Sequence, residues 1–132
     1  MKCVGRTETV CFPELETGPI AAKIDTGAYG NAMHADDISV QDDILSFYIG
    51  GTRHFFSEFD TVVVRNSFGK KQKRYSVRLN MKLGNKSYRI MVSLASREKM
   101  KYPVLIGRRF LRKFGYMVDV SRKDVNDKAQ QS

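Results

Sequence analysis

The sequence is poor in the residues that build disulfide frameworks and metal centres, with 2 cysteines and 2 histidines in 132 residues. Cys3 and Cys11 are too few for a disulfide framework and lack the spacing of zinc ligands, so we expect both to be reduced strand residues. A His-Glu-x-x-His zinc motif is absent, and so is a Gly-x-x-x-x-Gly-Lys-Ser/Thr phosphate loop. We therefore expect no metal and no cofactor.

Long apolar runs are also missing. No segment approaches the roughly 18 apolar residues that a membrane-spanning helix needs. Residues 1–8 lack the apolar core of a secretory signal. These two absences predict a cytoplasmic protein without membrane contact.

What is present suits one globular domain. A domain of 132 residues buries about two-thirds of its unfolded surface, and the hydrophobic fraction of 42% is enough for a core. The polar residues from 123 onward predict a frayed tail. We expect a domain over residues 1–122 and a tail over 123–132.

Charge is distributed unevenly along the chain. Residues 1–60 carry 4 Lys and Arg against 10 Asp and Glu, whereas residues 61–132 carry 19 against 4. The densest basic cluster is Lys70-Lys71-Gln72-Lys73-Arg74. It is interpreted either as a solvated hairpin tip or loop, or as an electrostatic guide for an acidic peptide or nucleic acid. Too few aromatic residues flank it for base stacking, so nucleic acid is the less favoured ligand.

The pattern of apolar residues predicts a mostly-β fold. Residues 75–83 alternate strictly between apolar and polar, which is typical of a half-buried strand, and Gly84-Asn85 predicts a hairpin to 88–94. A single helix is predicted over 108–114, ending at Gly115. We expect an all-β fold, a small closed or partly closed barrel with one short C-terminal helix. The other predicted strands are 4–12, 19–25, 44–49, 55–64 and 116–120.

The candidate chemistry lies at Asp25-Thr26-Gly27, which follows the apolar run 20–24. A hydroxyl and turn amides can orient a carboxylate in such a turn, and glycine lets other backbone approach. A lone turn carboxylate is commonly structural. Two carboxylates that share one proton, however, can activate water against a peptide carbonyl. The chain has one such turn, so the second acid must come from a second copy, and peptidase activity would require a homodimer.

Several motifs together resemble a known family. Asp25-Thr26-Gly27-Ala28 with Ile106-Gly107-Arg108 is similar to the retropepsin-type aspartic peptidases. The whole chain resembles more closely a retropepsin-like family often labelled ATP-dependent zinc proteases. The matching segments are 4–8, 22–28, 32–35, 66–70, 102–111 and 118–121.

The resemblance implies an acid-protease fold in which Asp25, Thr26 and Gly27 form the catalytic turn and Gly107 and Arg108 support it. Some relatives accompany glutamate-ligating enzymes, which implies acidic, glutamate-rich peptide or protein substrates. Ala28, Lys71 and Arg74 are then the expected substrate-binding residues. Zinc and ATP, which the label implies, lack their motifs here.

The chain also departs from this family. After Ala28 the sequence reads Tyr29-Gly30-Asn31, where the family commonly has a basic residue followed by Thr-Ser. Because position 29 is not acidic, Arg108 is expected to pair elsewhere, with Asp36, with Asp37 or with the other subunit. His34 is interpreted as a core or supporting histidine rather than a catalyst.

Two functions are therefore compatible with the sequence. The first is a homodimeric aspartic endopeptidase that acts on acidic peptides, with residues 68–74 either a flap over the cleft or an exposed hairpin. The second is a catalytically silent binding module of the same fold, which would hold an acidic partner through residues 70–78.

Overall fold

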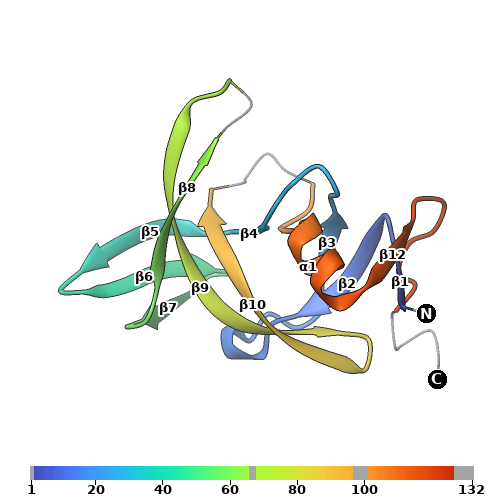
Figure 1. The fold of residues 1–132 in the computed structure, drawn as a ribbon. Helices are drawn as coiled ribbons and strands as arrows, with labels where there is room; N and C mark the ends of the chain where they lie inside the picture. Colours follow the sequence, from blue (N-terminus) through green and yellow to red (C-terminus); the bar gives the residue numbers. More distant parts are fainter. Residues whose placement is uncertain (1, 66–67, 97–100, 127–132) are drawn as a thin grey trace.

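The computed structural model describes residues 2–65, 68–96 and 101–126. The described chain is mostly strand, with one α-helix (Figure 1). The strands are β1 (Lys2–Gly5), β2 (Thr7–Cys11), β3 (Ile20–Ile24), β4 (Asn31–His34), β5 (Asp36–Gln41), β6 (Ile44–Ile49), β7 (Thr52–Phe56), β8 (Asp60–Arg65), β9 (Lys71–Leu83), β10 (Lys86–Ala95), β11 (Val104–Ile106) and β12 (Tyr116–Asp119). The helical elements are the 3-10 turn η1 (Pro13–Leu15) and the α-helix α1 (Arg108–Phe114).

Seven strands form the main sheet, in the order β10-β4-β11-β3-β2-β9-β8. Because β10 also pairs with β9, six of these strands return on themselves as a partly closed ring, and β8 remains an edge strand. The joint between β2 and β9 is short, with two residue pairs, Val10 with Leu83 and Cys11 with Lys82. The predicted mostly-β, partly closed fold with one short helix is confirmed.

Strand β9 supplies much of the core. Val77, Leu79, Met81 and Leu83 are buried on one side, while the residues between them are exposed. The strand pairs in antiparallel register with β10 through the turn at Gly84, whose φ of 63° suits glycine. The alternation therefore predicted both the strand and its hairpin correctly.

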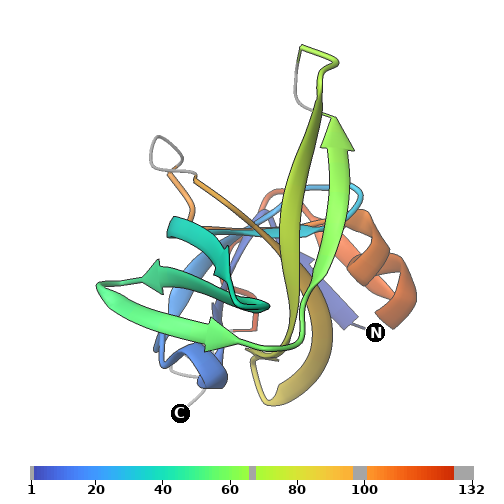
Figure 2. The same ribbon diagram turned by 90° about the vertical axis from the view of Figure 1, so that its left-hand side faces the viewer.

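Beyond the ring, β8 and β9 continue as a hairpin that stands away from the body (Figures 1 and 2). Of the two local structures expected for the basic cluster, hairpin tip or loop, the hairpin is the one observed, with Lys71–Arg74 in β9 and paired with β8. Phe68 lies beyond the strands and is exposed. Asn66 and Ser67, which complete the predicted turn, lie outside the described residues.

A second sheet, in the order β5-β6-β7, extends from one side of the molecule (Figure 1). Leu45 and Phe47 on β6 are fully buried and join it to the core. Arg53 crosses the sheet to donate to Asp37 at 3.0 Å and to the Ser46 hydroxyl at 2.6 Å. The sequence indicated an extended pattern for β6 but did not predict β5 or β4.

The two ends of the described chain are joined. β1 pairs in parallel with β12, and Arg6 separates β1 from β2, so the predicted strand 4–12 is two strands. Glu8 on β2 is fully buried, and its carboxylate accepts the N–H groups of Gly5, Val125 and Asn126 at 2.7, 3.0 and 3.0 Å. The expectation of a frayed tail is therefore wrong for residues 124–126. The domain boundary at residue 122 stays a prediction, and residues 127–132 lie outside the described part.

Both described cysteines are free thiols, on β1 and β2. No helix in the described part of the chain is long and apolar enough to cross a membrane.

Candidate active site

The Asp25 turn follows directly from β3. β11 lies beside β3 in parallel, and the Asp25 N–H donates to the carbonyl of Ile106 at 2.8 Å. The chain then turns so that the Gly27 N–H donates to Asp25 Oδ1 at 3.0 Å. One carboxylate oxygen is thus held by the turn, and the side chain is partly exposed. A carboxylate fixed in this way is preorganised without being removed from solvent.

The start of α1 packs against this turn. The N–H groups of Arg108 and Arg109 donate to the carbonyls of Ala28 and Tyr29 at 2.8 and 3.0 Å. A Cβ on Gly107 would meet the carbonyl oxygen of Gly30 and lie 2.7 Å from that of Tyr29. Glycine at position 107 is therefore required for the helix to approach the turn this closely. The structure brings the two predicted motifs together.

Arg108 does not contact either of the acids that the sequence suggested. Its Nη1 donates to the carbonyl of Gly27 at 3.0 Å, and its guanidinium lies 5.5 Å from the centre of the Tyr29 ring. Asp36 instead lies 3.2 Å from His34 Nε2, and Asp37 pairs with Arg53. Tyr29 offers an aromatic face where the retropepsin pattern offers an acid, and a cation–π contact takes the place of the expected ion pair.

Asn31 supports the start of α1, although the sequence marked it only as a departure from the family pattern. Its Oδ1 accepts the Gly107 N–H at 3.1 Å, and its Nδ2 donates to the carbonyl of Met91 at 3.1 Å. The amide thus links the α1 start to β10 through one side chain. Its partners are 60 and 76 residues away in the chain, so no local pattern could have revealed the role.

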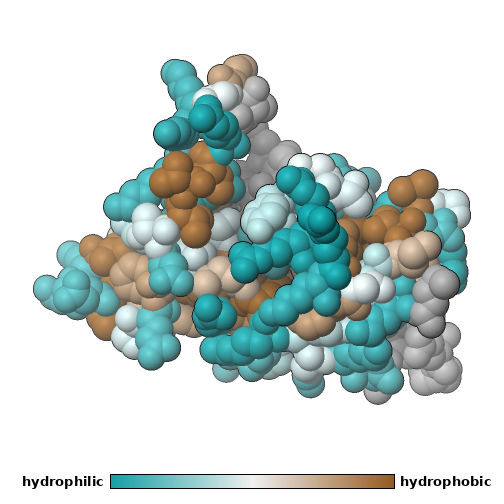
Figure 3. Space-filling view, viewed as in Figure 1, coloured by the Kyte–Doolittle hydropathy of each residue, from teal (hydrophilic) through white to brown (hydrophobic). Residues whose placement is uncertain are grey.

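A cleft of about 730 Å³ lies between the Asp25 turn, the inner face of the β8–β9 hairpin, β10 and α1. Gly27, Ala28, Arg74 and Arg108 line it. Among the described lining residues one side chain is acidic, Asp60, and seven are cationic: Arg65, Arg74, Arg78, Arg89, Arg108, Arg109 and Lys113. In the view of Figure 3, hydrophilic side chains lie over α1, and hydrophobic patches lie over β8 and near β12.

The other predicted site residues, which are Asp25, Thr26, Lys71 and Gly107, are not among the residues that line this cleft. Thr26 is exposed beside Asp25, and Gly107 is buried behind the turn. Lys71 is exposed at the start of β9, opposite Arg65. In the described part of the chain no three His, Cys, Asp or Glu side chains gather as metal ligands would.

These features define a retropepsin-like fold, with one Asp-Thr-Gly turn supported by one Gly-Arg helix in the described chain. A family model described as "RimB-like: Retropepsin-like aspartic endopeptidase RimB" matches residues 52–129. The chain belongs to this RimB-like family. The matched segment contains the hairpin, α1 and β12 and begins after the Asp25 turn.

Curated relatives carry a different name. The chain is 29% identical over 119 residues to a "Probable alpha-L-glutamate ligase" of Desulfotalea psychrophila, and the match covers 81% of this chain and 26% of that protein. It is 30% identical over 117 residues to a protein of the same name from Parasynechococcus marenigrum, with 80% and 25% covered. The chain thus spans about a quarter of the length of these relatives.

A solved structure is similar over nearly the whole fold. It is the crystal structure of Lpg0085, a protein of unknown function from Legionella pneumophila, at 28% identity and a TM-score of 0.74. The match covers 96% of this chain and 98% of that chain. This match leaves only a few residues of the chain uncovered, whereas the family model matches residues 52–129.

Proposed function

We propose that the chain is one subunit of a homodimeric aspartic endopeptidase that cleaves acidic peptides. The observation that carries the proposal is the Asp25 turn, fixed by β11 and α1, beside a cleft with seven cationic side chains and one acidic one among its described lining residues. The family description supports the reaction class. The charge of the cleft supports an acidic substrate, because cationic walls concentrate anions.

The reaction requires two carboxylates. Across a two-fold axis, Asp25 would face the partner subunit's Asp25, and two carboxyl groups about 3 Å apart share one proton. The ionised group takes a proton from water as the water attacks the peptide carbonyl, and the protonated group gives its proton to the carbonyl oxygen. The carboxyl group that took the proton from water then gives it to the leaving amine as the C–N bond breaks, and a hydroxyl of the diol intermediate returns its proton to the other carboxylate. In this proposal the β8–β9 hairpin, which lines one side of the cleft, would act as the flap that excludes bulk water.

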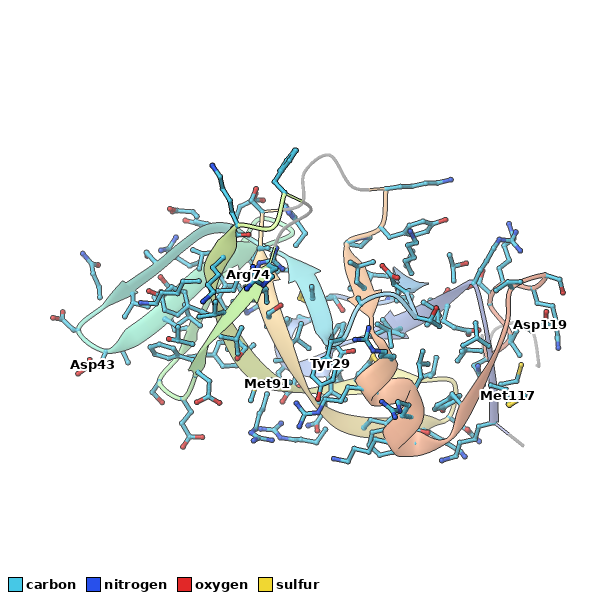
Figure 4. The ribbon with its side chains drawn as sticks, turned by 45° about the horizontal axis from the view of Figure 1, so that its top comes forward. Tyr29, Asp43, Arg74, Met91, Met117 and Asp119 are labelled. Carbon is cyan, nitrogen blue, oxygen red and sulfur yellow. The ribbon has the colours of Figure 1, made fainter. Side chains whose placement is uncertain are left out.

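The first test is cleavage of polyglutamate and of mixed-sequence peptides between pH 4 and 8. We expect Asp25→Asn to lower the rate by a factor of about 10⁴ or more, as removal of a nucleophile or base does in other peptidases. Asp43→Asn is a matched control, because Asp43 lies at the far tip of the small sheet (Figure 4). Equal cleavage by wild type and Asp25→Asn would contradict the proposal.

The dimer is tested by mixing. An excess of Asp25→Asn protein should draw wild-type subunits into mixed dimers and lower their activity, whereas the same mass of an unrelated protein should not. Activity that is independent of the added variant would show that one chain suffices. A strictly monomeric mass at working concentration would also contradict paired-aspartate catalysis.

A binding module without catalysis is the second candidate. It is favoured by the cationic cleft, which can hold an acidic chain without any reaction, and by relatives that are named for ligation rather than hydrolysis. It predicts that charge reversal at Lys71 and Arg74 abolishes binding of an acidic partner while Asp25→Asn leaves that binding unchanged.

A further inference from the structure

The cleft has a wall formed by alternate residues of β9. Arg74, Ser76 and Arg78 share one face of the strand, since side chains two apart point the same way. All three line the cleft. Ser76 lies opposite Asp60 on β8 and opposite Ser93 on β10, so it is at the centre of three strands.

Two hydrogen-bond donors on this wall are buried and unused. Ser76 is 1% exposed, and its Oγ has no hydrogen-bond partner among the described residues. The same is true of the Nε of Arg74, whose Nη2 donates to Gln72 Oε1 at 3.2 Å. Polar groups in protein interiors are nearly always paired. Two unpaired donors that lie two residues apart on one face of a strand therefore indicate a missing acceptor.

The chemistry of the wall specifies that acceptor. Arg74 carries a positive charge that has lost part of its hydration, and this burial lowers its pKa. A carboxylate has two oxygens and can accept from a guanidinium N–H and a hydroxyl at once. A neutral carbonyl could also accept hydrogen bonds, but it would leave the charge of Arg74 uncompensated. The cationic side chains around the wall favour the same choice.

Ser76 lies between two hollows of the molecule. Ser76 also lines a neighbouring hollow of about 430 Å³, which shares Asp60, Arg78, Arg89 and Met91 with the cleft. Figure 4 shows Arg74 and Met91 on the adjoining strands β9 and β10, and Tyr29 on the turn that follows Asp25. A group at Ser76 therefore lies where the two hollows join.

We propose that Arg74 and Ser76 form a subsite for one side-chain carboxylate of the peptide, which makes them specificity-determining residues. The proposal rests on the proposed function for the identity of the ligand as a peptide. Both donor atoms are covered in the structure, so binding requires the side chains above them to part. The carboxylate then supplies the acceptor that both donors lack.

Binding to the Asp25→Asn variant tests the subsite without any turnover. We would measure the affinity of labelled hexaglutamate and hexaglutamine by fluorescence anisotropy, with further substitutions made in that background. Ser76→Ala should weaken hexaglutamate binding about tenfold and leave hexaglutamine unchanged, since a hydrogen bond to a charged group contributes about that factor. Arg74→Gln should weaken it at least as much. Lys86→Gln, an equal change of charge at an exposed site outside the cleft, should have an effect below about twofold.

Thermal unfolding distinguishes the subsite from a structural role. Ser76→Ala removes a buried hydroxyl without a partner, so it should leave the melting temperature unchanged or raise it while binding weakens. Undiminished hexaglutamate binding by Ser76→Ala, or equal losses for both peptides, would overturn the proposal. If hexaglutamate binds selectively but wild type cleaves no peptide, the subsite stands and the proposed peptidase function fails.

Discussion

Tyr88 and Tyr116 form a pair whose hydroxyls lie 2.6 Å apart, within a cluster of rings that includes Phe110 and Phe114. Burial first, and then the hydrogen bond between its protonated hydroxyl and Tyr88, raise the pKa of Tyr116 well above its ordinary value of 10. Folding therefore favours the protonated phenol. The stability that results is fully present below about pH 10 and is lost as the pH rises toward the raised pKa, because the unfolded chain ionises first.

Tyr116→Phe should show this directly. At pH 8 we expect a loss of about 1 kcal/mol, because the Tyr88 hydroxyl loses its partner. Between pH 10 and 11 the variant should lose less stability than wild type, since it has no phenol at position 116 to ionise. Urea midpoints at pH 8, 10 and 11 measure both effects. Tyr48→Phe, which leaves the Tyr88–Tyr116 pair intact, should keep the wild-type dependence, and parallel curves for Tyr116→Phe and wild type would contradict the argument.

At the scale of elements, the turn after β3 and the start of α1 act as one unit, because backbone hydrogen bonds and the absence of a side chain at Gly107 hold them together. Gly107→Ala should cost about 1–3 kcal/mol of unfolding free energy, since the new methyl meets backbone carbonyls that cannot move separately. The proposed activity should fall with it as the Asp25 turn is displaced.

Gly30→Ala is the matched control. A Cβ there meets nothing within 4 Å, and both changes alter the unfolded chain alike. Unfolding curves in urea should thus separate the two alanine variants. Equal stability would show that the approach of helix and turn is not tight.

The sequence predicted correctly those elements that are determined by residues close together in the chain. The alternation from Tyr75 to Leu83 indicated β9, and Gly115 correctly ended α1 with a φ of 71°. The resemblance to the retropepsin-type peptidases implied that Gly107-Arg108 supports the Asp25 turn. The sequence did not predict the partner of Arg108 or the unpaired Ser76, because both depend on residues brought together from distant strands. For the turn between β5 and β6 the sequence indicated only a polar segment. Asp42 and Asp43 have positive φ values there, and no periodicity reveals such values.

At the scale of the whole molecule, Glu8 is the residue on which the two ends converge. Its carboxylate accepts three buried or part-buried backbone N–H groups, two of them from residues 117 and 118 positions away. Asn126 Nδ2 adds a bond of 2.8 Å to the carbonyl of Cys3. Residues 125 and 126 are thus tied by hydrogen bonds to β1 and β2.

Glu8→Ala should release that segment. Three backbone donors lose their acceptor at once, so we expect a loss of about 3–5 kcal/mol, given about 1–3 kcal/mol for each unsatisfied group and partial access to water. Hydrogen exchange at Val125 and Asn126 should accelerate more than exchange in β9 and β10. Glu58→Ala removes an exposed carboxylate and should change neither quantity. Unaltered exchange at Val125 would rule out this role for Glu8.

The joined ends also set an order of assembly. The β9–β10 hairpin and the small sheet close loops of a few residues, whereas β1 with β12 and Glu8 with Val125 close loops of more than 110 residues. Contacts so distant in sequence form slowly, because the chain entropy must be lost before they stabilise anything. During synthesis β1 would therefore wait without its partner until β12 emerges, whereas β2 can pair with β3 much earlier, and the β1–β12 pair would form last.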